Sequence, residues 1–407
     1  MRPPRTPVEA VLHAARDVTR LDQAFDAEML GGALLGSVYA IAPGARAAAV
    51  RDFVETFLTR TARRRTPAAA AVRQVFAALV PDAPGAARVR AGTQPPAWAG
   101  QLGRVRLTGS HGYGDVYGDQ TSYVATFRYE DPAVGGPEHA VVALVDHNLG
   151  IVKDIHVGPA ERIVPRLREL CAADELTAFV DVPAAVLHAR VDRYLAVTDE
   201  LSELPGEGSL ATDRVLLGAR LRAIPVAAGG PAPEPRAAGG STAPQGSGSA
   251  LAAQFLESAE AAAAGLTGLE ESDRLCLDFT LGLVLDHAET FEEPDPLRWS
   301  PAVVGFFLLD WVHRRAVLDD ADAAMLPRVL RGWVAFAARR RGLPPVAAAA
   351  VQAAVDELTE EFRRLHASGD RRSEAARAVA LLMAEGVDPS DPVALGAWLR
   401  VNAERSS

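Results

Sequence analysis

The stretch "HAVVALVDHNLGIVKDIHV" (residues 139–157) decides the fold of the middle of the chain. Its first half, "HAVVALVD" (139–146), is almost continuously apolar, which is typical of a central strand. The next four residues, "HNLG" (147–150), supply an asparagine and a glycine for a tight turn. "GIVKDIHV" (150–157) then returns as a second strand, so the stretch predicts an antiparallel hairpin.

A four-residue turn also predicts the register of this hairpin. The predicted pairs are Asp146 with Ile151, Val145 with Val152, Leu144 with Lys153, and Ala143 with Asp154. Lys153 then lies diagonal to Asp146, within reach of a salt bridge, while Asp154 and His156 share the opposite face. A slip of one residue would exchange the two faces.

Further strands lie on both sides of the hairpin. "GRVRLTG" (103–109) and "YVATFRYE" (123–130) alternate between apolar and polar residues, and the glycine-rich segment between them, residues 109–123, is expected to be a long loop. These segments predict a four-stranded antiparallel meander over residues 103–157. "LTAFVDV" (176–182) predicts a fifth strand, and residues 159–172, 183–197 and 212–224 are expected to be helices. Residues 91–224 are therefore expected to form an α+β domain with a four- to five-stranded, mainly antiparallel sheet.

The two ends of the chain are predicted to be helical. In residues 1–90, Thr6-Pro7 and Thr66-Pro67 are typical helix starts, because the hydroxyl caps the helix and proline needs no hydrogen-bond acceptor there. Residues 251–407 contain amphipathic helices throughout and predict an all-α domain. Between the domains, residues 225–250 are rich in Pro, Gly, Ala and Ser, which predicts a flexible linker spanning about 25–30 Å.

The hairpin also contains the one lysine of the chain, Lys153, among 41 arginines. This preference for arginine indicates a compositional bias that disfavours Lys, Asn and Ile throughout the chain. A site that keeps these residue types is therefore a candidate for function. The proposed site is a polar pocket that brings together the hairpin residues Asp146, His147, Lys153, Asp154 and His156 with His111, Asp115 and Asp119 of the glycine-rich segment. Carboxylates and imidazoles could bind a divalent metal there, and lysine could stabilise developing negative charge.

A structural interpretation of the same residues is open as well. Asn148 and Gly150 suit the turn itself, and Lys153 with Asp146 suits a cross-strand ion pair. Under this interpretation His156 is a surface residue. The sequence favours the structural interpretation, and it identifies no metal and no cofactor.

Several classes of protein have no support in the sequence. The two cysteines are far apart and show no zinc-binding spacing, and neither the P-loop signature nor a nucleophile elbow is present. The glycine-rich segment 109–123 lacks the dinucleotide-binding pattern, and a phosphate-binding loop there is the less favoured alternative to a strand-to-strand loop. The N-terminal residues lack the apolar run of a secretory signal, and "VVGFFLLDWV" (303–312) is too short to span a bilayer. A cytoplasmic protein without a membrane partner is expected.

The charge is unevenly distributed along the chain. The formal net charge is −10, but residues 1–110 carry 15 arginines and 8 acidic residues, or +7. The run "RTARRR" (60–65) could contact nucleic acid, although arginines near the end of a helix also complement its dipole and remain solvated. The second interpretation is favoured.

Three segments resemble a group of uncharacterised actinobacterial proteins: "PPAWAGQLGRVRLTG" (95–109), "LVDHNLGIVKD" (144–154) and "SPAVVGFFLLDW" (300–311). The resemblance covers much of the chain outside residues 225–250. It implies no activity and assigns no functional residues.

Three hypotheses of function follow, and the sequence does not decide whether the protein is an enzyme. The leading one is a cytoplasmic interaction or regulatory protein with a protein partner, because no catalytic motif is found and two domains offer separate surfaces. The alternative is a metal-assisted hydrolase of a phosphate ester, centred on residues 146–156. The third is nucleic-acid binding through the arginine-rich N-terminal helices, which should weaken steeply with salt.

Overall fold

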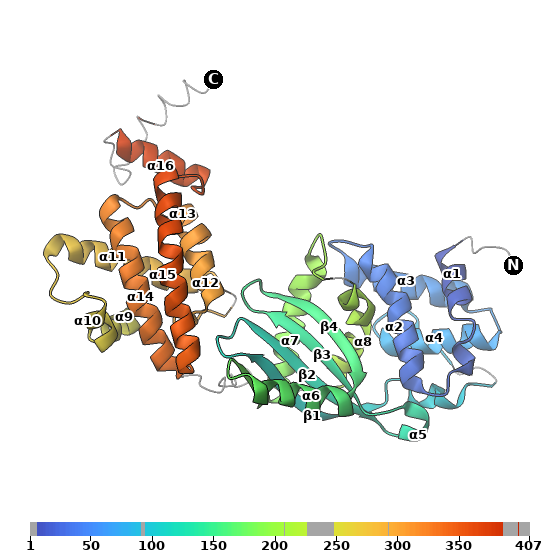
Figure 1. Ribbon diagram of the computed structural model, residues 1–407. Helices are drawn as coiled ribbons and strands as arrows, with labels where there is room; N and C mark the ends of the chain where they lie inside the picture. The colour runs from blue at the N-terminus through green and yellow to red at the C-terminus, as the bar shows by residue number, and fades with distance from the viewer. Residues whose placement is uncertain are drawn as a thin grey trace. The chain divides into compact units, whose positions relative to one another are not determined.

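The computed structural model describes residues 6–90, 94–206, 208–225, 248–291, 293–385 and 398. The chain divides into two compact units, unit 1 (residues 1–238) and unit 2 (residues 239–407). Unit 1 contains helices and an antiparallel sheet, and the described part of unit 2 is helical, which confirms the predicted α+β class (Figure 1). Most of the predicted linker, residues 225–250, lies outside the described residues.

Unit 1 is built on a five-stranded antiparallel sheet. Its strands are β1 (Val105–Asp115), β2 (Gln120–Tyr129), β3 (His139–Asp146), β4 (Ile151–Pro159) and β5 (Thr177–Asp181). The order across the sheet is β4-β3-β2-β1-β5. The first four strands form the predicted meander, and β5 pairs antiparallel with β1 at the far edge.

The prediction of a long loop over residues 109–123 is wrong. Strand β1 continues through the glycines to Asp115, and only four residues connect it to β2. The glycines allow close approach of the two strands: a Cβ atom at Gly114 would lie 2.5 Å from the carbonyl oxygen of Gln120. The glycines of this segment therefore allow β1 to pair closely with β2.

The two faces of the sheet are covered differently. Tyr123, Phe127 and Tyr129 of β2 belong to the large core of unit 1, together with buried residues of α7 (Ala184–Glu200) and α8 (Ser209–Arg222). On the other face, α6 (Ala160–Ala173) packs over Val124 and Ala140 (Figure 1). The three helices agree with those predicted from the sequence.

Four helices precede the sheet: α1 (Pro7–Ala14), α2 (Ala24–Ala40), α3 (Arg46–Thr61) and α4 (Pro67–Leu79). Shorter helical turns are Val18–Arg20, Ala86–Arg88, Ala97–Gln101 and α5 (Pro132–Gly135). The predicted caps are confirmed, because Thr6 Oγ1 accepts a hydrogen bond from Glu9 N and Thr66 Oγ1 accepts one from Ala69 N.

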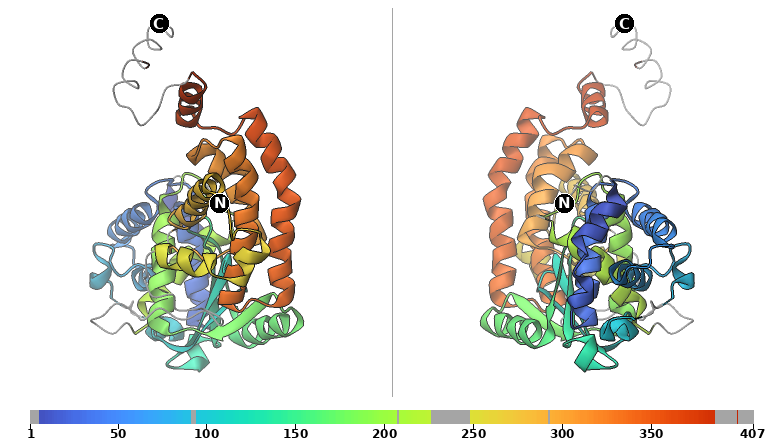
Figure 2. Two further views of the ribbon diagram at one scale, coloured as in Figure 1. Left: turned by 90° about the vertical axis from the view of Figure 1, so that its left-hand side faces the viewer. Right: turned by 90° about the vertical axis from the view of Figure 1, so that its right-hand side faces the viewer.

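Helix α2 packs closely along α8 (Figure 2). A Cβ atom at Gly36 would lie 2.4 Å from the carbonyl oxygen of Ala211, so a larger residue would push the helices apart. Through this contact one hydrophobic core runs from Val8 to Ile224.

The described part of unit 2 is helical, as predicted for residues 251–407. Its helices are α9 (Gly248–Leu256), α10 (Ala259–Ala263), α11 (Glu271–Ala288), α12 (Pro301–Phe306), a π-helical turn (Phe307–Trp311), α13 (Val312–Arg315), α14 (Asp320–Arg341), α15 (Pro345–Ser368) and α16 (Glu374–Ala384). The rings of Phe255, Trp333 and Phe336 meet in its core. No helix that the structure describes has the length and apolar character needed to cross a bilayer.

Candidate functional site

The β3–β4 hairpin has the predicted turn but only part of the predicted register. Asp146 pairs with Ile151 and Val145 with Val152, which confirms the first two predicted pairs. Beyond them the prediction is wrong, because Leu144 pairs with Asp154 and Lys153 is an extra residue in β4. Such a β-bulge shifts every later side chain to the other face. It places Ile155 and Val157 in the core, whereas the predicted register would have placed Asp154 there.

Asp146 organises the turn. Its Oδ1 accepts hydrogen bonds from the backbone amides of Asn148 and Leu149, both at 3.0 Å. Its Oδ2 accepts one from Gln120 Nε2 at 3.2 Å and lies 3.3 Å from Lys153 Nζ. The Asp146 side chain is only 8% exposed. Four donors therefore surround a nearly buried carboxylate.

Lys153 therefore forms the predicted ion pair with Asp146. Its side chain is half-buried, and the bulge lets the ammonium group reach the carboxylate from the edge strand β4. Lysine suits this geometry because it is a compact charge on a flexible stem.

The other candidate residues of the hairpin lie in different surroundings. His147 contacts Tyr194 Oη of α7 through Nδ1 and Thr121 Oγ1 of β2 through Nε2, both at 3.1 Å. Asp154 accepts hydrogen bonds from the amide of Ile155 and from Ser209 Oγ at the start of α8. His156 is exposed.

The candidates from the glycine-rich segment support strand β1 and its turn. His111 Nδ1 lies 2.7 Å from Asp181 Oδ1 of β5. The Asp115 carboxylate accepts hydrogen bonds from the amides of Gly118, Asp119 and Gln120 and so holds the β1–β2 turn. The carbonyl of Asp119 accepts the amide of His147, which joins the two turns at this end of the sheet.

Of the eight candidate residues, Asp146 and Lys153 form a side-chain ion pair. Across the part of the chain that the structure describes, no three His, Cys, Asp or Glu side chains form a group that could hold a metal ion. Asp115 and Asp146 accept hydrogen bonds from backbone amides of the two turns, whereas His147 contacts the side chains of Tyr194 and Thr121.

The tip of the hairpin leaves one apolar side chain in solvent. Leu149 is 64% exposed, between Asn148 and Gly150. Gly150 has a φ of 71°, a conformation that other residues adopt only with strain. The exposed leucine therefore sits on a turn whose shape is fixed by Asp146 on one side and by a glycine on the other.

Sequence reasoning missed a buried ionic network behind the sheet. Arg220 of α8 donates to Glu28 Oε2 of α2 at 2.5 Å, to Tyr129 Oη at 2.8 Å and to His139 Nε2 at 2.8 Å. Glu28 also accepts Tyr129 Oη at 2.6 Å and the amide of Gly103 at 2.7 Å. Burial and the nearby guanidinium lower the pKa of His139 to about 3, so this imidazole is neutral and accepts the bond from Arg220.

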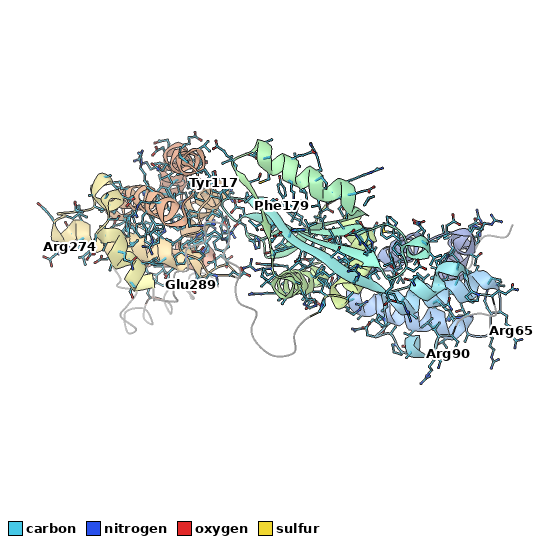
Figure 3. All side chains as sticks on the ribbon, turned by 90° about the horizontal axis from the view of Figure 1, so that it is seen from below. Arg65, Arg90, Tyr117, Phe179, Arg274 and Glu289 are labelled. Atoms are coloured by element: carbon cyan, nitrogen blue, oxygen red, sulfur yellow. The ribbon has the colours of Figure 1, made fainter. Side chains whose placement is uncertain are left out.

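The arginines of the run at residues 60–65 lie in solvent. Arg60, Arg63, Arg64 and Arg65 are exposed at and beyond the end of α3, and Arg65 extends away from the unit (Figure 3). Their exposure agrees with both hypotheses for this run, a solvated helix end and a nucleic-acid contact.

No known protein family, curated protein or solved structure matches the chain.

Proposed function

We propose that the protein is an interaction or regulatory protein that contacts a protein partner through the tip of the β3–β4 hairpin. The observation that carries the proposal is the exposed Leu149 on a turn held by four donors to Asp146. An apolar side chain held in solvent on an ordered turn gains free energy when an apolar pocket of a partner removes it from water.

Rigidity of the turn is the second part of the argument. A contact that must first be ordered loses binding free energy to conformational entropy, whereas a pre-formed turn avoids most of that cost. The charges beside the leucine cancel, because Lys153 and Asp146 form an ion pair. The expected partner surface is therefore an apolar pocket with a neutral polar rim.

Affinity capture with matched variants tests the proposal. Leu149→Ser removes the apolar anchor, and Ile41→Ser removes an equally apolar side chain, 80% exposed, from the end of α2 in the same unit. A partner identified by quantitative mass spectrometry should be retained by the wild type and by Ile41→Ser and lost from Leu149→Ser. Calorimetry with the purified partner should then show at least tenfold weaker binding to Leu149→Ser, or about 1.4 kcal/mol.

The opposite pattern would overturn the proposal. If every captured protein binds Leu149→Ser as strongly as the wild type, the hairpin tip is no interface. If both variants lose the captured protein equally, the binding is nonspecific and depends on exposed apolar side chains in general. Circular dichroism should first show that both variants keep the fold of the wild type.

A further inference from the structure

Unit 1 contains a hollow of about 120 Å³ between α2, α3, α4 and α8. Its wall is partly apolar, with Val50, Leu79 and Val215, and partly cationic, with Arg51, Arg214 and Arg222. An apolar cavity of roughly 150 Å³ can hold a molecule of the size of benzene. The hollow is somewhat smaller than that, but it opens to solvent, so a small organic molecule can enter it in part, and its arginines favour an anion.

Gly218 creates the room in which two of these arginines meet. It lies inside α8, where glycine costs about 1 kcal/mol relative to alanine. A Cβ atom built at this position would lie 3.0 Å from Arg214 Nη1 and 3.6 Å from Arg222 Nη1. Both guanidinium groups therefore approach the same point, and a side chain in place of the glycine would occupy it.

Within the described residues, the hydrogen bonds that hold both side chains run through Nε and Nη2 of Arg214 and Nη2 of Arg222. Arg214 donates from Nε and Nη2 to the two carboxylate oxygens of Asp199, at 3.0 and 2.6 Å. Arg222 donates from Nη2 to the carbonyl of Leu79 at the end of α4. The two arginines are thus positioned in advance, with one donor group of each turned toward Gly218.

The surroundings of the hollow have an excess of positive charge. Three arginines, Arg51, Arg214 and Arg222, line it with one aspartate, Asp82, and Arg214 also pairs with Asp199 behind it. The pKa of Arg222 lies below its usual value because the protein displaces water from it, an effect that Asp82 opposes and the like charge of Arg214 reinforces. A bound anion would relieve this repulsion.

We infer that the hollow binds the carboxylate of a small organic acid, with the acid's apolar body against Val50, Leu79 and Val215. Guanidinium groups recognise carboxylates through short, charge-assisted hydrogen bonds. The apolar wall selects an acid with a hydrocarbon body over a small inorganic anion. This site is independent of the hairpin tip and does not rest on the proposed partner interaction.

Benzoate is the probe, and benzamide, which has the same shape without the charge, is the control. Isothermal titration calorimetry on the full chain should show saturable binding of benzoate with one site per chain and no measurable binding of benzamide. Benzoate should raise the midpoint temperature of unfolding of unit 1 in a concentration-dependent way, because it binds the folded state. Raising the salt concentration should weaken the binding.

Two variants connect the binding to this hollow. Gly218→Ala keeps the helix and adds a methyl group that displaces Arg214 Nη1, so benzoate should bind at least fivefold more weakly. Gly282→Ala is the matched control in α11, where an added Cβ meets nothing within 4 Å, and it should bind as the wild type does. Arg222→Met removes one cation and should weaken binding at least tenfold.

Three results would overturn the inference. They are the absence of saturable benzoate binding, equal binding of benzamide, and unchanged binding to both Gly218→Ala and Arg222→Met. Inorganic phosphate provides one more discrimination: if it binds in the hollow and benzoate does not, the ligand is a phosphate and the assignment to a carboxylic acid is wrong.

Discussion

At the scale of single residues, Asp146 is the position on which the hairpin depends most. Asp146→Ala would leave the amides of Asn148 and Leu149 and the Lys153 ammonium without their acceptor. Unsatisfied donors cost about 1–3 kcal/mol each when they are buried and less when water can reach them. We expect Asp146→Ala to lower the free energy of unfolding by about 2–3 kcal/mol in urea denaturation.

Lys153→Met is the comparison for that variant. The Lys153 side chain is 38% exposed, and partly solvated ion pairs contribute at most about 1 kcal/mol. The loss of stability should therefore be clearly smaller than for Asp146→Ala. A larger loss would mean that the lysine has a structural role beyond its pair with Asp146.

A second residue, His287 of α11, should make stability depend on pH. It is buried among the rings of Phe291, Trp299 and Phe307, and burial, with a smaller contribution from Arg298, lowers its pKa from 6.5 to about 4. The unfolded chain binds a proton more readily than the folded one, so the stabilisation is complete above pH 6.5 and is lost as the pH falls toward 4. The shift corresponds to roughly 3 kcal/mol.

The measurement for His287 is the free energy of unfolding of unit 2 between pH 7 and pH 4. His287→Phe should flatten this dependence, because the phenyl ring keeps the aromatic contacts and does not titrate. Parallel pH curves for the wild type and the variant would show that other groups are responsible for the loss.

Residue contacts were predictable where they are local in sequence. The turn residues and the Lys153–Asp146 pair follow from a seven- to eight-residue stretch in which few geometries are open. Glu28 and Arg220 are 192 positions apart, and no spacing rule connects residues on α2 and α8. Only the packing of the two helices on the sheet brings them together.

At the scale of helices, arginines cap the C-terminal ends. Arg46 donates to the carbonyl of Tyr39 at the end of α2, Arg73 to that of Thr61 at the end of α3, and Arg222 to that of Leu79 at the end of α4. The last carbonyls of a helix lack partners within it and carry partial negative charge. The arginine-rich composition therefore serves helix ends within unit 1.

Arg73→Met tests this role. The variant keeps the aliphatic stem but removes the hydrogen bonds to the carbonyls of Thr61 and Arg64. We expect a loss of about 1–2 kcal/mol in the free energy of unfolding, since a charged donor is removed from a helix end. Arg63→Met, an exposed neighbour, should change stability by less than about 0.5 kcal/mol. Equal effects of the two variants would argue against capping.

Element types were predictable from the sequence, but two details of the sheet were not recognised. The glycine-rich composition of residues 109–123 predicts a loop, whereas close approach of the strands requires the glycines here. The bulge at Lys153 has a signal in the sequence: the core residues Val152 and Ile155 are three positions apart, and a regular strand would place them on opposite faces.

At the scale of the whole molecule, the α+β class and the helical C-terminal part follow from the change of hydrophobic period along the chain. The core that the N-terminal helices share with the sheet does not follow from this change of period. Val54, Phe57 and Phe76 of α3 and α4 belong to the same core as Phe127 and Tyr129 of the sheet. An amphipathic helix shows that a face is buried, but its sequence does not name the surface that buries it.

The division into two units predicts two independent unfolding transitions. Each unit has its own buried aromatic residues, such as Phe127 and Tyr194 in unit 1 and Phe255 and Trp333 in unit 2. Differential scanning calorimetry of the full chain should therefore resolve into two transitions, and fragments 1–238 and 239–407 should each reproduce one of them.

Arg220→Met leaves Glu28 as an unpaired buried charge and should lower only the unit 1 transition, by a loss of about 3–5 kcal/mol. Trp333→Ala creates a cavity in unit 2 and should lower only the other, by a similar amount. If either variant shifts both transitions equally, or if a fragment alone is unfolded, the two units stabilise one another and the chain folds as a single cooperative body.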